Sequence, residues 1–471
     1  MSSKDLEVAV RDHPEGSERS DVSDPPVKKT KWRYLWDSFD KSPEERRFIL
    51  KLDLGLLLAA CLGFFIKYLD QSNLNNAFVS GMKEDLGMYA NQLNYVQTLW
   101  TVGYIIGEVP SNILITRVRP SIWISAMQIV WSVLTMAMSR CSTVTQLYVL
   151  RFFIGLAESG FYPGMSYLIG SWYRKDEIAK RSGIFNASSA VATMFSGYLM
   201  TGMIGLDGKH GFKGWQWLFI MDGVISLPIA VASIFLIPDS PENTRAWYFN
   251  ENDKKIALQR MELEGRGKPS PYTKAKIIKI LKSWHIYLLP LIYVVQAVFA
   301  LWLKAMGTYS VAQINNYPTI TSAVQIIATL VYAWVSDSVL GGKRHPLVIF
   351  SGIFSLILYI SMAVWDIAEG WKWACFVLMG QSIALSPMIF TWANEICSDD
   401  AEERAIVVAA TNDFAYVINA WLPLIIWKQV DAPVFRKGYI TAACMAVGLI
   451  AVASIIPALI RRDVRKRVVA G

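Results

Sequence analysis

The chain has 471 residues, of which 53% are hydrophobic and only 18% are charged, with a formal net charge of +8. A soluble domain of this size would carry more charge, so the composition indicates a membrane protein. The basic residues lie in short segments between apolar runs, which membrane topology explains better than a nucleic-acid partner does.

The N-terminal segment, residues 1–51, is polar and charged and does not resemble a signal peptide. We expect a cytosolic tail, disordered in its first part. Apolar windows long enough to cross a bilayer as helices then recur along the chain. The first six of these expected spans lie near 53–79, 92–116, 121–139, 144–170, 183–205 and 216–237.

A polar stretch, residues 239–283, follows the sixth span and reads as a cytosolic linker. Six further spans are expected near 284–304, 317–338, 346–365, 372–392, 405–427 and 438–460, before a basic tail at 461–471. The expected fold is therefore all-α: a polytopic membrane protein with twelve transmembrane helices in two six-helix bundles, 52–238 and 284–460. Transmembrane β-strands would alternate in polarity over about ten residues, and no such alternation appears.

The distribution of Lys and Arg predicts the orientation of these spans. One side of the expected membrane carries 35 of them, the other carries 8, and three lie within spans. Cytosolic loops are enriched in Lys and Arg, so we expect an even number of spans with both termini in the cytosol. Eleven or thirteen spans would place one basic terminus outside.

Several charged side chains fall inside the expected spans, where a charge is costly and marks a candidate functional residue. Lys67 and Asp70 share one face of the first span. Glu108 lies in the second span, and Arg151 and Glu158 lie two turns apart on one face of the fourth. Alternatives stay open: Lys67 and Asp70 could neutralise one another, Arg151 with Asp70 could be a structural tie, and Glu108 could face water.

Glu158 is the strongest of these candidates. No basic residue lies within one helical turn of it, and small residues and Pro163 surround it, which permits close helix approach and bending. A carboxyl group without a local basic partner in apolar surroundings takes up a proton readily, so Glu158 is the expected proton carrier.

The two halves resemble each other after their second spans. Asp337 precedes Lys343 and Arg344 in the second half, and Asn112 precedes Arg117 and Arg119 in the first. This pattern resembles the Gly/Asp/basic loop motif of the major facilitator superfamily, with the acid replaced by Asn112 in the first half. The resemblance implies a gating role for Asp337, Lys343, Arg344, Arg117 and Arg119.

Longer stretches resemble one branch of that superfamily, the anion:cation symporter family with its fungal vitamin and allantoate permeases. The resemblance covers about residues 45 to 460 and is greatest to the pantothenate permeases, while biotin, nicotinate and allantoate permeases share most of the motifs. The matching stretches are 65–86, 103–112, 151–164, 170–174, 214–219, 315–318, 392–397 and 403–407.

The resemblance implies proton-driven uptake of a small organic anion. It implies that Asp70 and Glu158 couple protons, that Arg151 pairs with Asp70, and that Tyr104 lines the solute cavity. Gln71 departs from the pattern, because bacterial and animal members place there the Arg that holds the solute carboxylate. We therefore expect Lys67, on the same helix, to supply the positive charge.

The remaining candidates are polar residues of other spans. Asn186 joins Lys67, Gln71 and Tyr104 as an expected solute contact; the sequon that it begins should be unused within a span. Weaker candidates in the second half are Asn412 with Asp413 and Asn394 with Glu395.

Enzymatic and ATP-driven functions lack support in the sequence. The four histidines fall in loops, tails or span edges, the five cysteines have no metal-type spacing, and there is no Walker-type phosphate loop. We expect no cofactor and no metal, a proton gradient as the driving force, and a monomer in the plasma membrane. A nutrient sensor built on the same fold is the alternative of another class.

Overall fold

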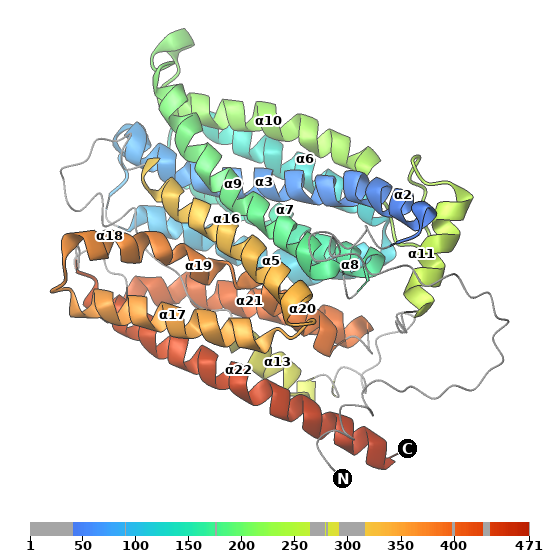
Figure 1. The fold of residues 1–471 in the computed structure, drawn as a ribbon. Coiled ribbons are helices and arrows are strands. Elements are labelled where there is room, and N and C mark those ends of the chain that lie inside the picture. The colour runs from blue at the N-terminus through green and yellow to red at the C-terminus, as the bar shows by residue number, and fades with distance from the viewer. Residues whose placement is uncertain are drawn as a thin grey trace.

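The structure is a computed structural model that describes residues 41–89, 91–174, 177–263, 278, 281–291, 316–397, 401–426 and 434–470. Every regular element in these ranges is a helix, as expected, and the long helices run side by side (Figure 1). The first half contains α2 (Pro43–Leu52), α3 (Leu58–Ala77), α5 (Gln92–Arg117), α6 (Pro120–Ala137), α7 (Val144–Glu158), α8 (Phe161–Trp172), α9 (Ile178–Ile204) and α10 (Gly214–Leu236).

One helix, α11 (Glu251–Leu263), lies in the linker. The second half contains α13 (His285–Leu291), α16 (Pro318–Trp334), α17 (His345–Val364), α18 (Glu369–Leu378), α19 (Gly380–Ile383), α20 (Ser386–Ile396), α21 (Ala401–Ile426) and α22 (Arg436–Ala470). The span expected at 284–304 begins with α13, and its remainder lies outside the described residues. The halves meet where α9 packs on α16 and α5 packs on α21.

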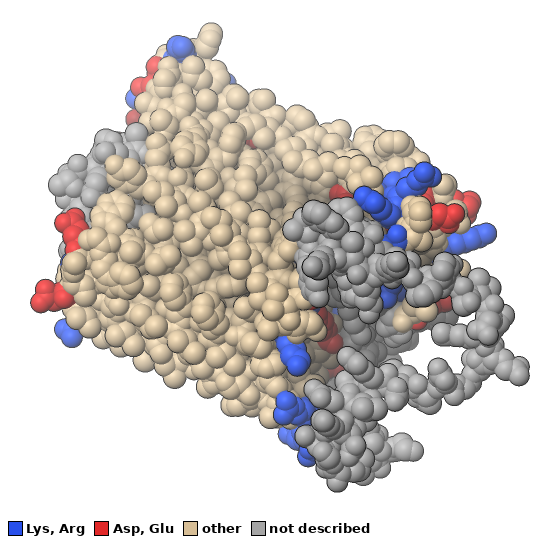
Figure 2. All heavy atoms as spheres, viewed as in Figure 1, with Lys and Arg blue, Asp and Glu red and all other residues tan. Residues whose placement is uncertain are grey.

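The surface shows an uncharged band. Figure 2 shows a wide uncharged middle, with Lys, Arg, Asp and Glu gathered at the two ends of the molecule. Seven helical segments in the described ranges are long and apolar enough to cross a membrane. They are 43–85, 120–140, 214–236, 318–339, 345–364, 369–396 and 436–463. The helices α5 and α9 are not among them, and in α21 a shorter apolar stretch, Ile406–Ile418, is found.

Four expected spans differ in detail from the structure: the tenth is divided into α18, α19 and α20, and the twelfth continues in α22 through the expected tail to Ala470. The first begins ten residues before the expected 53, because Ser42 caps a helix at Pro43 that continues through a π-helical turn (Asp53–Leu57) into α3. Phe48 of α2 is fully buried, 5.6 Å from the ring of Phe249, so the end of the expected tail packs on the bundle. The fourth span is divided after Glu158 into α7 and α8.

Two glycines allow α5 and α7 to approach closely. A Cβ atom on Gly155 would lie 2.0 Å from the carbonyl oxygen of Trp100, and one on Gly103 would lie 2.1 Å from that of Phe152. Backbones this close exclude any side chain at either position. The contact places Trp100 and Tyr104 of α5 against the end of α7 that carries Glu158.

A charged network inside the helical bundle

Lys67 lies at the centre of a network of buried polar side chains. It is fully buried on α3, and its Nζ donates a hydrogen bond of 3.1 Å to the hydroxyl of Tyr104. The same Nζ lies 4.4 Å from the centroid of the Tyr104 ring, a cation–π distance. Its charge acts on Glu158 and Glu108, but neither forms a direct ion pair with it. Lys67 and Asp70, which could have neutralised one another, also form no ion pair.

Glu158 lies at the end of α7 and is fully buried. Its Oε2 accepts a hydrogen bond of 3.2 Å from Nε2 of Gln71, so the residue that replaces the family's Arg contacts the expected proton carrier. The indole of Trp100 lies beside the same carboxyl group. Oε1 of Glu158 and Nε1 of Trp100 are buried with no well-formed hydrogen bond, so the carboxyl oxygen can take up a proton and the indole N–H can donate to a solute.

Glu108 connects the network to the second half of the molecule. Nδ2 of Asn412 on α21 lies 3.1 Å from both carboxyl oxygens of Glu108 and 3.3 Å from the hydroxyl of Tyr104. The carboxyl group of Asp413 also contacts that of Glu108. Glu108 is fully buried, so its possible exposure to water is not seen. Asn412 and Asp413 therefore face the network from the other half.

Asp70 and Arg151 lie close together but form no direct ion pair. Nη2 of Arg151 donates a hydrogen bond of 3.4 Å to the main-chain carbonyl of Asp70. The Asp70 carboxylate accepts a hydrogen bond of 3.1 Å from the hydroxyl of Thr135. Both residues are almost completely buried. The guanidinium group thus ties α7 to α3 through the backbone.

Sequence reasoning missed Asp222. This acid on α10 is fully buried, accepts a hydrogen bond of 2.9 Å from Asn73, and contacts the carboxyl group of Asp70. A signal was present, because Asp222 lies inside an apolar window, the criterion that selected Glu158.

Asn186 lies apart from these contacts. Its side-chain amide donates a hydrogen bond of 2.9 Å to the carbonyl of Ser182, one turn earlier on α9. No contact of Asn186 with Lys67 or Tyr104 is seen. Its solute contact stays a prediction.

The expected gating residues occupy one end of the bundle, and most of them form ion pairs. Arg344 is buried and binds the carboxylates of Asp337 and Glu395, the latter at 2.6 Å. Arg119 forms an ion pair of 2.8 Å with Asp239 at the start of the linker. Lys343 is exposed, and the side chain of Arg117 lies outside the described part of the structure.

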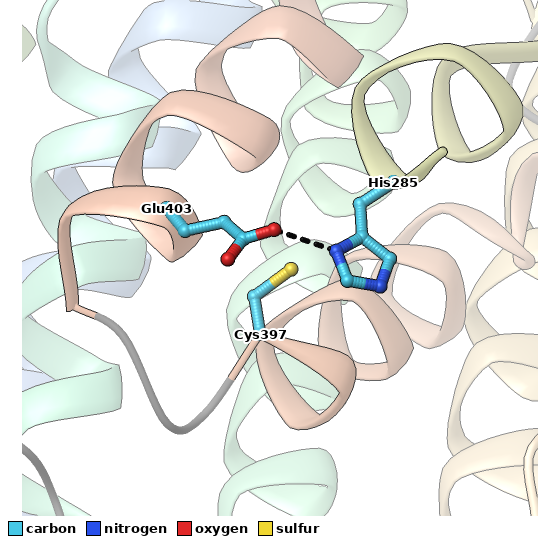
Figure 3. A group of neighbouring side chains, drawn as sticks. All are labelled: His285, Cys397 and Glu403. Carbon is cyan, nitrogen blue, oxygen red and sulfur yellow. Dashed lines mark hydrogen bonds and ion pairs between the residues drawn. The ribbon is translucent and has the colours of Figure 1, made fainter. Parts of the chain in front are cut away.

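Three potential metal ligands converge at the same end of the bundle. His285, Cys397 and Glu403 lie on or beside the ends of three helices, with their ligand atoms within 4.8 Å of one another (Figure 3). Nδ1 of His285 lies 2.7 Å from Oε1 of Glu403. Two ligands of one tetrahedral zinc ion are separated by roughly 3.3 Å, so this contact is a hydrogen bond that ties α13 to α21.

The charges of the network do not balance. Among the described residues of this network, the acids are Asp70, Glu108, Glu158, Asp222 and Asp413, and the cations are Lys67 and Arg151. Ionised carboxylates without partners are strongly disfavoured in such an interior, so protons must neutralise part of the set. The interior can therefore bind protons and offers a buried ammonium group to an anion.

Apolar helices in two packed halves, with buried charges where the halves meet, define a membrane transporter of the secondary type, in which two halves move around a central site. Residues 60–423 match the family model of the Major Facilitator Superfamily. The chain belongs to this superfamily.

Curated relatives and solved structures agree with this assignment. The chain is 38% identical to "Pantothenate transporter liz1" of Schizosaccharomyces pombe, over 84% of this chain and 79% of that one. It is 33% identical to "Pantothenate transporter FEN2" of Saccharomyces cerevisiae, over 88% and 84% of the two chains. The fold is similar to that of the proton:xylose symporter XylE, with a TM-score of 0.66 and 13% identity over 88% of this chain and 96% of that one.

Proposed function

We propose that this protein takes up a small organic anion together with protons, and that pantothenate is the solute. The observation that carries the proposal is the similarity, over more than four fifths of the chain, to two pantothenate transporters. The fold supports secondary transport.

Lys67 is the proposed anchor for the solute carboxylate. It is buried, it points its charge at the hydroxyl and ring of Tyr104, and no carboxylate forms an ion pair with it among the described residues. An anion entering a low-dielectric interior gains most from such an unpaired cation. Pantothenate also carries hydroxyl and amide groups, for which Gln71 and the indole of Trp100 offer donors.

Glu158 is the proposed proton carrier. Its carboxyl group lies next to Gln71, with one oxygen that forms no well-defined hydrogen bond, close to the charge of Lys67. Protonation of Glu158 leaves the charge of Lys67 available to the solute anion. Release of the proton restores the attraction between Glu158 and Lys67 and weakens the hold on the anion. Asp70, one turn from Lys67, is the second proposed proton-coupling residue.

We place the protein in the plasma membrane as a monomer with both termini in the cytosol. The end of α22, α2 and α11 lie at one end of the bundle (Figure 1), and this end carries most of the charged side chains visible in Figure 2. The excess of Lys and Arg at this end supports a cytosolic location for it.

Biotin is the second candidate solute. The chain is 28% identical to "Vitamin H transporter" of Saccharomyces cerevisiae, over 88% of this chain and 72% of that one. Biotin also carries a carboxylate, which Lys67 could bind in the same way.

Growth rescue separates these candidates. A yeast strain without its own pantothenate uptake, given this chain, should grow on limiting pantothenate, whereas biotin-dependent and allantoate-dependent strains should not. A protonophore should abolish uptake of labelled pantothenate. Rescue of the biotin strain alone would reassign the solute, and surface expression without any rescue would favour a nutrient sensor.

A further inference from the structure

Glu108 and Asp413 form a contact between acids across the two halves of the molecule. Glu108 belongs to α5 of the first half and Asp413 to α21 of the second, and their carboxyl groups are in hydrogen-bond contact. Glu108 is fully buried, and Oδ1 of Asp413 is buried with no hydrogen bond from any donor among the described residues.

The neighbouring side chains do not neutralise both acids. Asn412 donates to both oxygens of Glu108, but it carries no charge. The cation that acts on Glu108 is Lys67, whose hydrogen bond goes to Tyr104 and whose charge also acts on Glu158. Tyr104 contributes a hydroxyl that accepts from Lys67 and Asn412. Among the described groups, the charge of Lys67 is thus divided between Glu108 and Glu158, and no cation acts on Asp413.

We propose that Glu108 and Asp413 share one proton, and that this proton holds the two halves together at the network. Glu108 is fully buried and Asp413 is partly buried. Two adjacent carboxyl groups in such surroundings repel each other strongly when both are ionised, whereas one proton between them makes a hydrogen bond. Because secondary transporters work by moving one half against the other, loss of this proton would favour separation of α5 from α21. The proposal deepens the proposed proton coupling and relies on it only for the transport step.

The shared proton has a defined effect on stability. The folded protein holds a proton that the unfolded chain lacks, because both carboxyl groups are ionised above about pH 5 once exposed to water. Raising the pH therefore destabilises the folded form relative to the unfolded form. Glu108→Gln and Asp413→Asn replace the protonated acid by an amide, which donates a hydrogen bond at every pH.

The test is a pH-dependent double-mutant cycle on the purified full chain. Melting temperatures are measured from about pH 5 to about pH 9 for the unaltered protein, Glu108→Gln, Asp413→Asn and the double variant. The unaltered protein should lose about 2–4 °C more than either single variant over this range. The coupling between the two positions should be favourable at acidic pH and unfavourable at alkaline pH. Asp366→Asn, which changes an exposed acid, should retain the pH slope of the unaltered protein.

Equal pH slopes in the unaltered protein and both single variants would overturn the shared proton. If one variant fails to fold, the other alone makes the same comparison. Since melting needs no solute, a protein that does not transport pantothenate but shows the expected slopes would retain the acid pair and reject the proposed solute. If the protein transports pantothenate but its variants show no difference in pH slope, the proposed solute is retained and the acid pair is rejected.

Discussion

At the scale of residues, the central feature is the buried ammonium group of Lys67, which forms no ion pair with a carboxylate among the described residues. Lys67 occupies the helix face on which relatives of other branches place an Arg one turn further along, at the position of Gln71. Here Gln71 donates instead to Glu158, the proposed proton carrier, whose carboxyl group also feels the charge of Lys67, the proposed anion anchor. In this proposal, the solute carboxylate binds to Lys67 and the proton binds to Glu158, so the two ligands occupy neighbouring side chains.

Lys67→Met tests the anchor. Removing the charge while retaining most of the side-chain volume should lower uptake of limiting pantothenate about 10- to 100-fold, the worth of a charge-assisted hydrogen bond. Surface expression should not change. Lys437→Met, which removes an exposed Lys, is the matched control and should transport normally. Uptake by Lys67→Met equal to that of the control would remove Lys67 from the solute site.

Not all of this site could be read from the sequence. Lys67, Asp70 and Glu158 stand out because charges are rare in apolar windows. Their partners do not, since Gln71 and Glu158 are 87 residues apart and Glu108 and Asn412 are 304 apart. Which side chains meet is decided by how α3, α5, α7 and α21 pack, and apolar length and residue spacing do not reveal that packing.

At the scale of elements, the close contact of α5 with α7 positions Trp100 beside Glu158. The division of the fourth span after Glu158 was not predicted, because Gly160 and Pro163 indicate bending without fixing where the helix is interrupted. The start of the first span at Pro43 was signalled by Ser42, which caps the helix. The charged residues that follow Pro43 nevertheless read as part of a cytosolic tail. The order of the elements followed from apolar length alone.

Gly155→Ala tests this contact. The added Cβ would lie 2.0 Å from the carbonyl oxygen of Trp100, so α5 and α7 must move apart. The folded state should lose about 1–3 kcal/mol, measured as a lower melting temperature, and transport should fall because Trp100 shifts away from Glu158. Gly202→Ala on α9 meets nothing within 4 Å and should melt as the unaltered protein does or slightly higher. A Gly155→Ala protein as stable as Gly202→Ala would refute the close contact.

At the scale of the whole molecule, the described acids of the buried network outnumber its described cations, and an entering anion increases this imbalance. We propose that protons enter together with the anion for this reason. The central claim is therefore that a proton gradient drives the solute, with Glu158 as the carrier.

Transport by the purified protein in liposomes tests this claim most directly. An inward proton gradient should cause labelled pantothenate to accumulate, and a protonophore should abolish the accumulation. Glu158→Gln should fail to accumulate the solute while still exchanging internal for external pantothenate, because exchange needs no net proton movement. Accumulation by Glu158→Gln at the level of the unaltered protein, or accumulation without any dependence on the gradient, would contradict the account.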